Sequence, residues 1–135
     1  MFTRAFLMID QFRLCGDIWN VKFVGPHDPI LIDRQNILTI GVTDPATMTI
    51  YLSDRLRGEL LNKVFIHELG HATLFSAGLI ADIHRMVRKK YWIEAEEWVC
   101  NFIADYGREI FGAAYAVLGD QAIYIVPQQI EKRFI

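Results

Sequence analysis

The chain has few cysteines and no excess of charge of either sign. Its two cysteines, Cys15 and Cys100, are too few for a disulfide scaffold, which favours a reduced intracellular protein. Lys and Arg number 14 and Asp and Glu number 16, so the formal net charge is -2. The sequence therefore lacks the excess of basic residues that is typical of proteins that bind nucleic acid or an anionic membrane. We therefore expect neither of these as a direct partner.

Long uninterrupted apolar runs are also missing. A membrane-spanning helix needs about 20 apolar residues, and the best candidate, residues 110–126, is interrupted at Gly119 and Asp120. The N-terminal segment carries Arg4 and Asp10 among its apolar residues and has no small-residue cleavage site, so it lacks the pattern of a signal peptide. Both absences favour a cytoplasmic location.

What the chain does contain is ample material for one packed core. Its 135 residues allow a single domain, which we expect to span residues 1–135. Hydrophobic residues make up 53% of the sequence and charged residues 22%, a composition typical of a folded protein rather than a disordered one. No internal repeat, low-complexity stretch or Ser/Gly-rich linker divides the sequence.

Strand patterns fill the first half of the chain. Residues 18–24 form a run rich in β-branched and aromatic side chains, and a Gly-Pro-His-Asp-Pro break follows at residues 25–29. Residues 37–42 and 48–52 each alternate with a period of two, and residues 43–47 between them suit a hairpin loop. This half therefore predicts a small antiparallel sheet built on a hairpin.

Helical periodicity replaces strand alternation after Ser53, whose hydroxyl suits a helix N-cap, and Gly78 predicts the end of that helix. A short helix is expected over residues 81–90 and a longer one over residues 92–118. Strands followed by helices indicate an α+β fold, with the sheet packed on a helical half. Two sets of residues recur with the period of 3.6. The stripe of the first helix is Leu60, Val64, His67, His71 and Leu74. In the long helix the set is Phe111, Tyr115 and Leu118, which we expect to form core.

The residues that carry chemistry lie within the first long helix. Residues 67–71 read His-Glu-Leu-Gly-His, the H-E-x-x-H pattern. Residues four apart share a helix face, so His67 and His71 can direct two imidazole nitrogens to one zinc ion. Glu68 lies about 100° round the helix, where its carboxylate can reach a water bound to the ion and act as general base. A catalytic zinc site is favoured over two histidines in an apolar core, because such burial is costly without a shared cation.

A catalytic zinc site needs a third protein ligand, and no third histidine follows at a short spacing. Glu97 is the preferred ligand, because Asn101 and Ala104 follow it on the same helix face. Glu94 and Glu96 are interpreted instead as a solvated acidic first turn, which the helix dipole favours. The acidic candidates in this part of the chain are Asp82, Glu94, Glu96, Glu97 and Asp105.

Side chains around the motif are expected to have supporting roles. Gly70 costs a helix about 1 kcal/mol relative to Ala, so we expect a neighbouring element to approach closely behind the site. Other side chains are candidates for steadying the ligands or for donating a hydrogen bond to the oxyanion of a tetrahedral intermediate, although each type is more often structural. These candidates are Asn101, His84, Tyr91 and Tyr106.

These residues resemble the motifs of the ImmA/IrrE family of small metallopeptidases. Members carry H-E-x-x-H and, further on, a helix that reads approximately E-x-x-A-N-x-x-A; residues 97–104 read Glu-Trp-Val-Cys-Asn-Phe-Ile-Ala. Cys100 stands where the family usually has Ala, and residues 105–107 replace the family's frequent Leu-Met-Pro. With the hairpin, the resemblance covers residues 37–104. It implies that the zinc ligands and the base are His67, His71, Glu97 and Glu68.

The resemblance implies a zinc-dependent endopeptidase that hydrolyses a peptide bond in a protein substrate, often a repressor of a phage or mobile element. The alternative is a binding module that keeps the metal and grips a repressor or another partner without hydrolysis. The presence of Glu68 favours the enzyme, because a metal site that only binds has no need of a general base. Imidazole and carboxylate ligands also suit other divalent ions, such as manganese.

Overall fold

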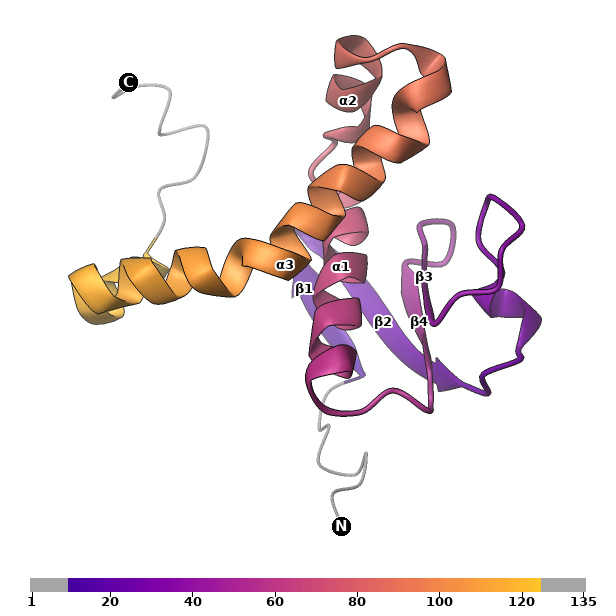
Figure 1. Ribbon diagram of the computed structural model, residues 1–135, viewed down its shortest axis with the longest axis horizontal. Helices are drawn as coiled ribbons and strands as arrows, with labels where there is room; N and C mark the ends of the chain where they lie inside the picture. The colour runs from indigo at the N-terminus through magenta and orange to yellow at the C-terminus, as the bar shows by residue number, and fades with distance from the viewer. Residues whose placement is uncertain (1–9, 125–135) are drawn as a thin grey trace. The chain divides into compact units, whose positions relative to one another are not determined.

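The computed structural model describes residues 10–124, and it confirms the α+β class. These residues fall into two compact units that divide between Ala104 and Asp105. The first unit contains β1 (Gln11–Leu14), β2 (Asp17–Val24), η2 (Pro29–Leu31), β3 (Gly41–Asp44), β4 (Thr49–Ser53), α1 (Gly58–Ser76), α2 (Ile80–Met86), η3 (Lys89–Tyr91) and the start of α3 (Trp92–Leu118) (Figure 1). The second contains the rest of α3 and η4 (Gly119–Ile123). The expectation of one domain stays a prediction.

The sheet is mixed rather than wholly antiparallel. Its strand order is β1-β2-β4-β3, so β3 lies at an edge. The pairs β1–β2 and β3–β4 are antiparallel, but β2 and β4 run parallel, from Asn20 opposite Thr49 to Val24 opposite Ser53. The predicted antiparallel sheet is therefore wrong for the central pair. Alternation shows which side chains share a face and carries no information on the direction of the neighbouring strand.

Strand β3 begins later than the alternation predicts. It starts at Gly41 rather than at residue 37. The residues before it are held by the preceding loop instead: the Thr39 N–H donates to the Leu31 carbonyl at 2.9 Å, and Leu38 forms an isolated bridge with Ile32. Contacts with this loop thus replace pairing with β4 over the first part of the predicted strand.

Helix α1 also begins later than predicted but ends where expected. Ser53 is not its cap, because that residue still pairs with β2 as the last residue of β4, and α1 starts at Gly58. At the other end Gly78 takes a φ of 71°, a conformation that glycine adopts without strain. The Leu79 N–H then donates to the Leu74 carbonyl at 2.8 Å, which closes the helix.

Two apolar clusters place α1 between the sheet and the other helices. The larger one lies between α1 and the sheet, and there the Trp19 Nε1–H donates to Ser76 Oγ at 2.8 Å and ties β2 to the end of α1. The smaller one joins the end of α1 to α2 and to the start of α3. Their buried members are Trp19, Ile50, Leu52, Leu56 and Ala72 in the first cluster and Leu74, Ile83 and Cys100 in the second.

The remaining helices follow the predicted order. The helix expected over residues 81–90 is shorter, because α2 ends at Met86, whereas α3 has the predicted bounds. Phe111, Tyr115 and Leu118 are 57%, 57% and 54% exposed, so the expectation that they form core is wrong. In the described part of the chain no single helix is long and apolar enough to cross a membrane. Together α1 and α2 have that length and composition, but they are bent by 88° at their break.

Candidate metal centre

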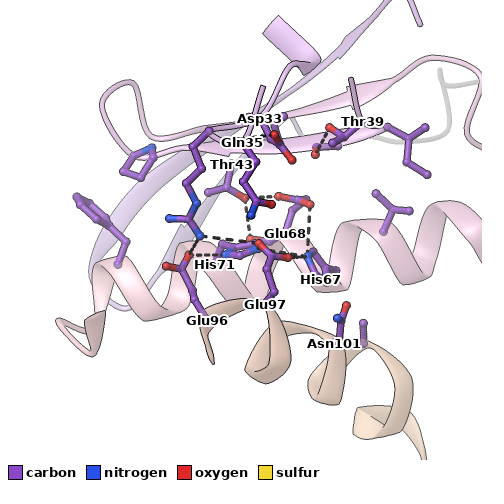
Figure 2. A pocket seen from close by; sticks show the side chains of 18 of the residues that line it. Asp33, Gln35, Thr39, Thr43, His67, Glu68, His71, Glu96, Glu97 and Asn101 are labelled. Atoms are coloured by element: carbon purple, nitrogen blue, oxygen red, sulfur yellow. Dashed lines mark hydrogen bonds and ion pairs between the residues drawn. The ribbon is translucent and has the colours of Figure 1, made fainter. Parts of the chain in front are cut away.

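A cleft of about 900 Å³ is bounded by the loop before β3, by β3 itself, by one face of α1 and by the start of α3. Four members of the predicted α1 stripe line it, from Leu60 to His71. The last member, Leu74, is a buried member of the smaller cluster, and Val64 also packs against the larger one. The polar side chains of both helices and of the strand side point toward one another in this cleft (Figure 2).

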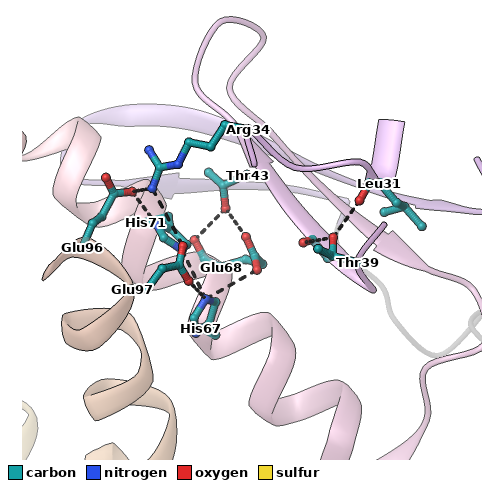
Figure 3. Close-up of polar contacts among 10 residues, drawn as sticks. Leu31, Arg34, Thr39, Thr43, His67, Glu68, His71, Glu96 and Glu97 are labelled. Carbon is teal, nitrogen blue, oxygen red and sulfur yellow. Dashed lines mark hydrogen bonds and ion pairs between the residues drawn. The ribbon is translucent and has the colours of Figure 1, made fainter. Parts of the chain in front are cut away.

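His67, His71 and Glu97 meet in the cleft. On α1 the Nε2 atoms of the two histidines are 3.2 Å apart, as the spacing of one helical turn predicts. On α3 the Glu97 carboxylate lies with Oε1 at 3.0 Å from His67 Nε2 and Oε2 at 3.1 Å from His71 Nε2 (Figure 3). One ligand atom from each residue lies within 4.8 Å of the others, so the cluster could hold a metal ion.

The spacing of these donor atoms fits a tetrahedral ion. Ligand atoms about 2.0–2.1 Å from a tetrahedral zinc ion lie about 3.3 Å from one another. The two Nε2 atoms are 3.2 Å apart, and each has a different oxygen of Glu97 beside it, at 3.0 Å from His67 and 3.1 Å from His71. Two imidazole lone pairs that face each other at this distance repel unless a proton or a cation lies between them. Two nitrogens and a carboxylate suit zinc, as well as several other divalent ions.

Glu68 is buried beside the ligands, with a relative exposure of 6%. Its Oε1 accepts a hydrogen bond of 2.8 Å from Thr43 Oγ1 on β3, and its Oε2 lies 3.9 Å from His67 Nε2. Burial raises the pKa of Glu68 above its ordinary value, against the opposing effects of the Thr43 hydrogen bond and the histidine charges. A carboxylate with a raised pKa next to the ligands suits a general base that works near neutral pH.

Hydrogen bonds within the cluster outweigh burial in setting the pKa values of His71 and Glu97. Burial alone would lower the pKa of His71, but hydrogen bonds to Cys100 and to both neighbouring glutamates raise it to about 12. Burial would raise the pKa of Glu97, but hydrogen bonds from His67 and His71 hold it well below its usual range. Without a metal ion, a protonated His71 therefore faces an ionised carboxylate at neutral pH. A cation that binds through His71 displaces that proton.

The prediction that Glu96 is solvated is wrong. Glu96 is 8% exposed rather than solvated, and its Oε2 lies 2.6 Å from His71 Nδ1 and 3.0 Å from an Nη2 of Arg34. Its burial would raise its pKa, but these bonds lower it. One signal could have found it: Cys100 lies one turn later on the same helix face, and cysteine is usually buried. Nothing in the sequence pattern points to Arg34, which comes from the loop between η2 and β3.

The other predicted candidates are divided between the cleft and its surroundings. Asn101 lines the cleft one turn after Glu97, and His84 lines it with its ring stacked on Trp92, 3.7 Å between ring centroids. Tyr91 lies in η3, is 44% exposed and is not part of the cleft wall. Tyr106 belongs to the second unit and is 56% exposed, so its role stays a prediction.

No protein-family model matches the chain, and no curated protein sequence matches it. Donor atoms of His67, His71 and Glu97 that could hold a metal ion lie within the cleft. The buried carboxylate of Glu68 lies beside them, and an edge strand forms one wall. This arrangement can bind an ion, place a base next to it and leave room for an extended ligand.

Proposed function

We propose that the protein is a zinc-dependent endopeptidase that hydrolyses a peptide bond in a protein substrate. The observation that carries the proposal is the convergence of His67, His71 and Glu97 on one point of the cleft, with Glu68 beside them. The resemblance to ImmA/IrrE metallopeptidases supports the same ligands and favours a repressor as the substrate. The intact base argues against the alternative of a binding module that does not hydrolyse its partner.

The side chains of the cleft divide the chemical work among them. When bound, zinc supplies a Lewis acid that polarises the scissile carbonyl and makes a water molecule more acidic. Thr43 occupies Oε1 of Glu68, which leaves Oε2, on the side of His67, to accept the proton of the attacking water. Glu68 then delivers this proton to the nitrogen of the leaving amine.

The backbone of β3 offers a place for an extended peptide. Because the Ser53 N–H donates to the Ile40 carbonyl and bonded positions alternate in antiparallel pairing, the N–H groups of Gly41 and Thr43 point away from β4. Both residues also line the cleft. A peptide that adds to this edge gains main-chain hydrogen bonds, which give affinity with little sequence discrimination. It would then pass beside Glu68, the partner of Thr43.

Replacement of Glu68 by Gln tests hydrolysis directly. We expect Glu68→Gln to bind zinc as the wild type does and to cleave a degenerate peptide library at least ~10²-fold more slowly, as measured by mass spectrometry. Glu94→Gln, at an exposed position on α3, is the matched control and should keep the wild-type rate. A chelator should abolish wild-type cleavage and added zinc should restore it. Zinc-loaded wild type that cleaves nothing, or Glu68→Gln that cleaves normally, contradicts the proposal.

A further inference from the structure

Two consecutive glutamates of α3 contact the two ring nitrogens of His71. Glu97 Oε2 lies 3.1 Å from Nε2, the nitrogen that faces His67. Glu96 Oε2 lies 2.6 Å from Nδ1. An ionised carboxylate only accepts hydrogen bonds, so Nδ1–H of His71 donates to Glu96. The ring is thereby oriented with Nε2, and not Nδ1, toward the predicted ligand Glu97.

Arg34 holds Glu96 in this place. Its Nη2 lies 3.0 Å from Glu96 Oε2, the same oxygen that accepts from His71, and 3.8 Å from Glu97 Oε2 (Figure 3). A buried carboxylate is costly unless it is paired and hydrogen-bonded, and Glu96 has both kinds of partner. These contacts connect three elements around one imidazole, namely the loop between η2 and β3, helix α3 and helix α1.

We propose that Glu96 is a positioning residue for the metal ligand His71 and that Arg34 keeps Glu96 in that role. The inference rests on the metal site of the proposed function but not on peptide hydrolysis. A carboxylate bonded to the outer nitrogen of a ligating histidine fixes the tautomer and the ring orientation, and it makes the ligating nitrogen more basic. Removal of such a partner typically weakens metal binding about 10–100-fold.

Zinc affinity, measured by competition with a fluorescent chelator, tests this role. Glu96→Ala should bind zinc about 10–100-fold more weakly than the wild type. Glu96→Gln keeps an oxygen that can accept from Nδ1–H, so its loss should be smaller. Arg34→Gln should also lose less than Glu96→Ala, because Glu96 itself remains. Glu94→Ala, an exposed glutamate two residues earlier on the same helix, is the matched control and should keep the wild-type affinity.

A spectrum separates positioning from a general loss of stability. With Co²⁺ in place of zinc, the visible absorption reports the ligand geometry, which Glu96→Ala should change and Glu96→Gln should largely restore. Equal zinc affinities for Glu96→Ala and Glu94→Ala overturn the inference. Should Glu96→Ala fail to fold, Glu96→Leu decides, because it keeps bulk at this position but cannot accept from Nδ1–H; a zinc affinity equal to that of Glu94→Leu overturns the inference. Zinc-binding protein that cleaves no peptide would refute the proposed function and leave this inference standing, whereas wild type that binds no zinc overturns both.

Discussion

Gly70 lies in the middle of α1, where the predicted close approach of a neighbouring element is confirmed. A Cβ added at Gly70 would lie 3.0 Å from Cys100 Sγ and 3.3 Å from both the Cα and the Cβ of Cys100. Cys100 is fully buried in α3, the helix that also carries Glu97. The absence of a side chain at Gly70 therefore lets the two helices come close enough for Glu97 to reach the histidines of α1.

The substitution Gly70→Ala is expected to destabilise the protein. In an uncrowded helix the change from Gly to Ala stabilises by about 1 kcal/mol. Here the new methyl group meets the backbone of α3, which cannot rotate away, and overpacking of this kind costs about 1–3 kcal/mol. The net effect is a loss of about 0–2 kcal/mol. The control Gly112→Ala, where nothing lies within 4 Å of an added Cβ, should instead stabilise its helix by up to about 1 kcal/mol.

Urea denaturation of the metal-free variants, followed by far-UV circular dichroism, measures these free energies of unfolding. Cys100→Ala removes Sγ, the atom nearest to the added methyl group. Gly70→Ala should therefore cost less in the Cys100→Ala background than in the wild type, with a coupling of about 1 kcal/mol. If Gly70→Ala stabilises as much as Gly112→Ala and shows no coupling to Cys100→Ala, the reasoning from close helix packing is refuted.

The remaining predictions concern protons and hydrogen bonds at the cluster. Because the pKa of His71 is raised to about 12 without metal, zinc displaces a proton when it binds. The affinity of the protein for zinc, measured by chelator competition, should therefore rise about tenfold per pH unit between about pH 6.5 and 8.5. A flat profile contradicts this. The same shift stabilises the metal-free fold fully below pH 6.5, and this stabilisation is lost only as the pH rises through the folded-state pKa. Thr43→Val should slow peptide cleavage about tenfold or more at unchanged zinc content, because a hydrogen bond to a charged group contributes about 1.5–3 kcal/mol. Thr43→Ser keeps the hydroxyl and should restore the rate. Equal rates for the two variants contradict the role of Thr43.

The parts of the fold that were predictable are those that depend on neighbours along the chain. The bounds of α3 and the stop at Gly78 agree with the sequence patterns, because helical periodicity and a left-handed C-terminal glycine act over a few residues. The N-cap expected at Ser53 was wrong because that residue pairs with a distant strand. The core expected around Phe111 was wrong because a shared helix face does not specify what covers it.

For the candidate site the division is similar. The H-E-x-x-H spacing was sufficient to bring His67 and His71 together, since the geometry of one helical turn is the same in every protein. The environments of Glu96 and Glu97 depend instead on how closely α3 approaches α1, which the packing at Gly70 decides. The contact of Arg34 depends on a loop from the strand half of the chain. Such contacts follow from packing between distant segments, and no local pattern encodes them.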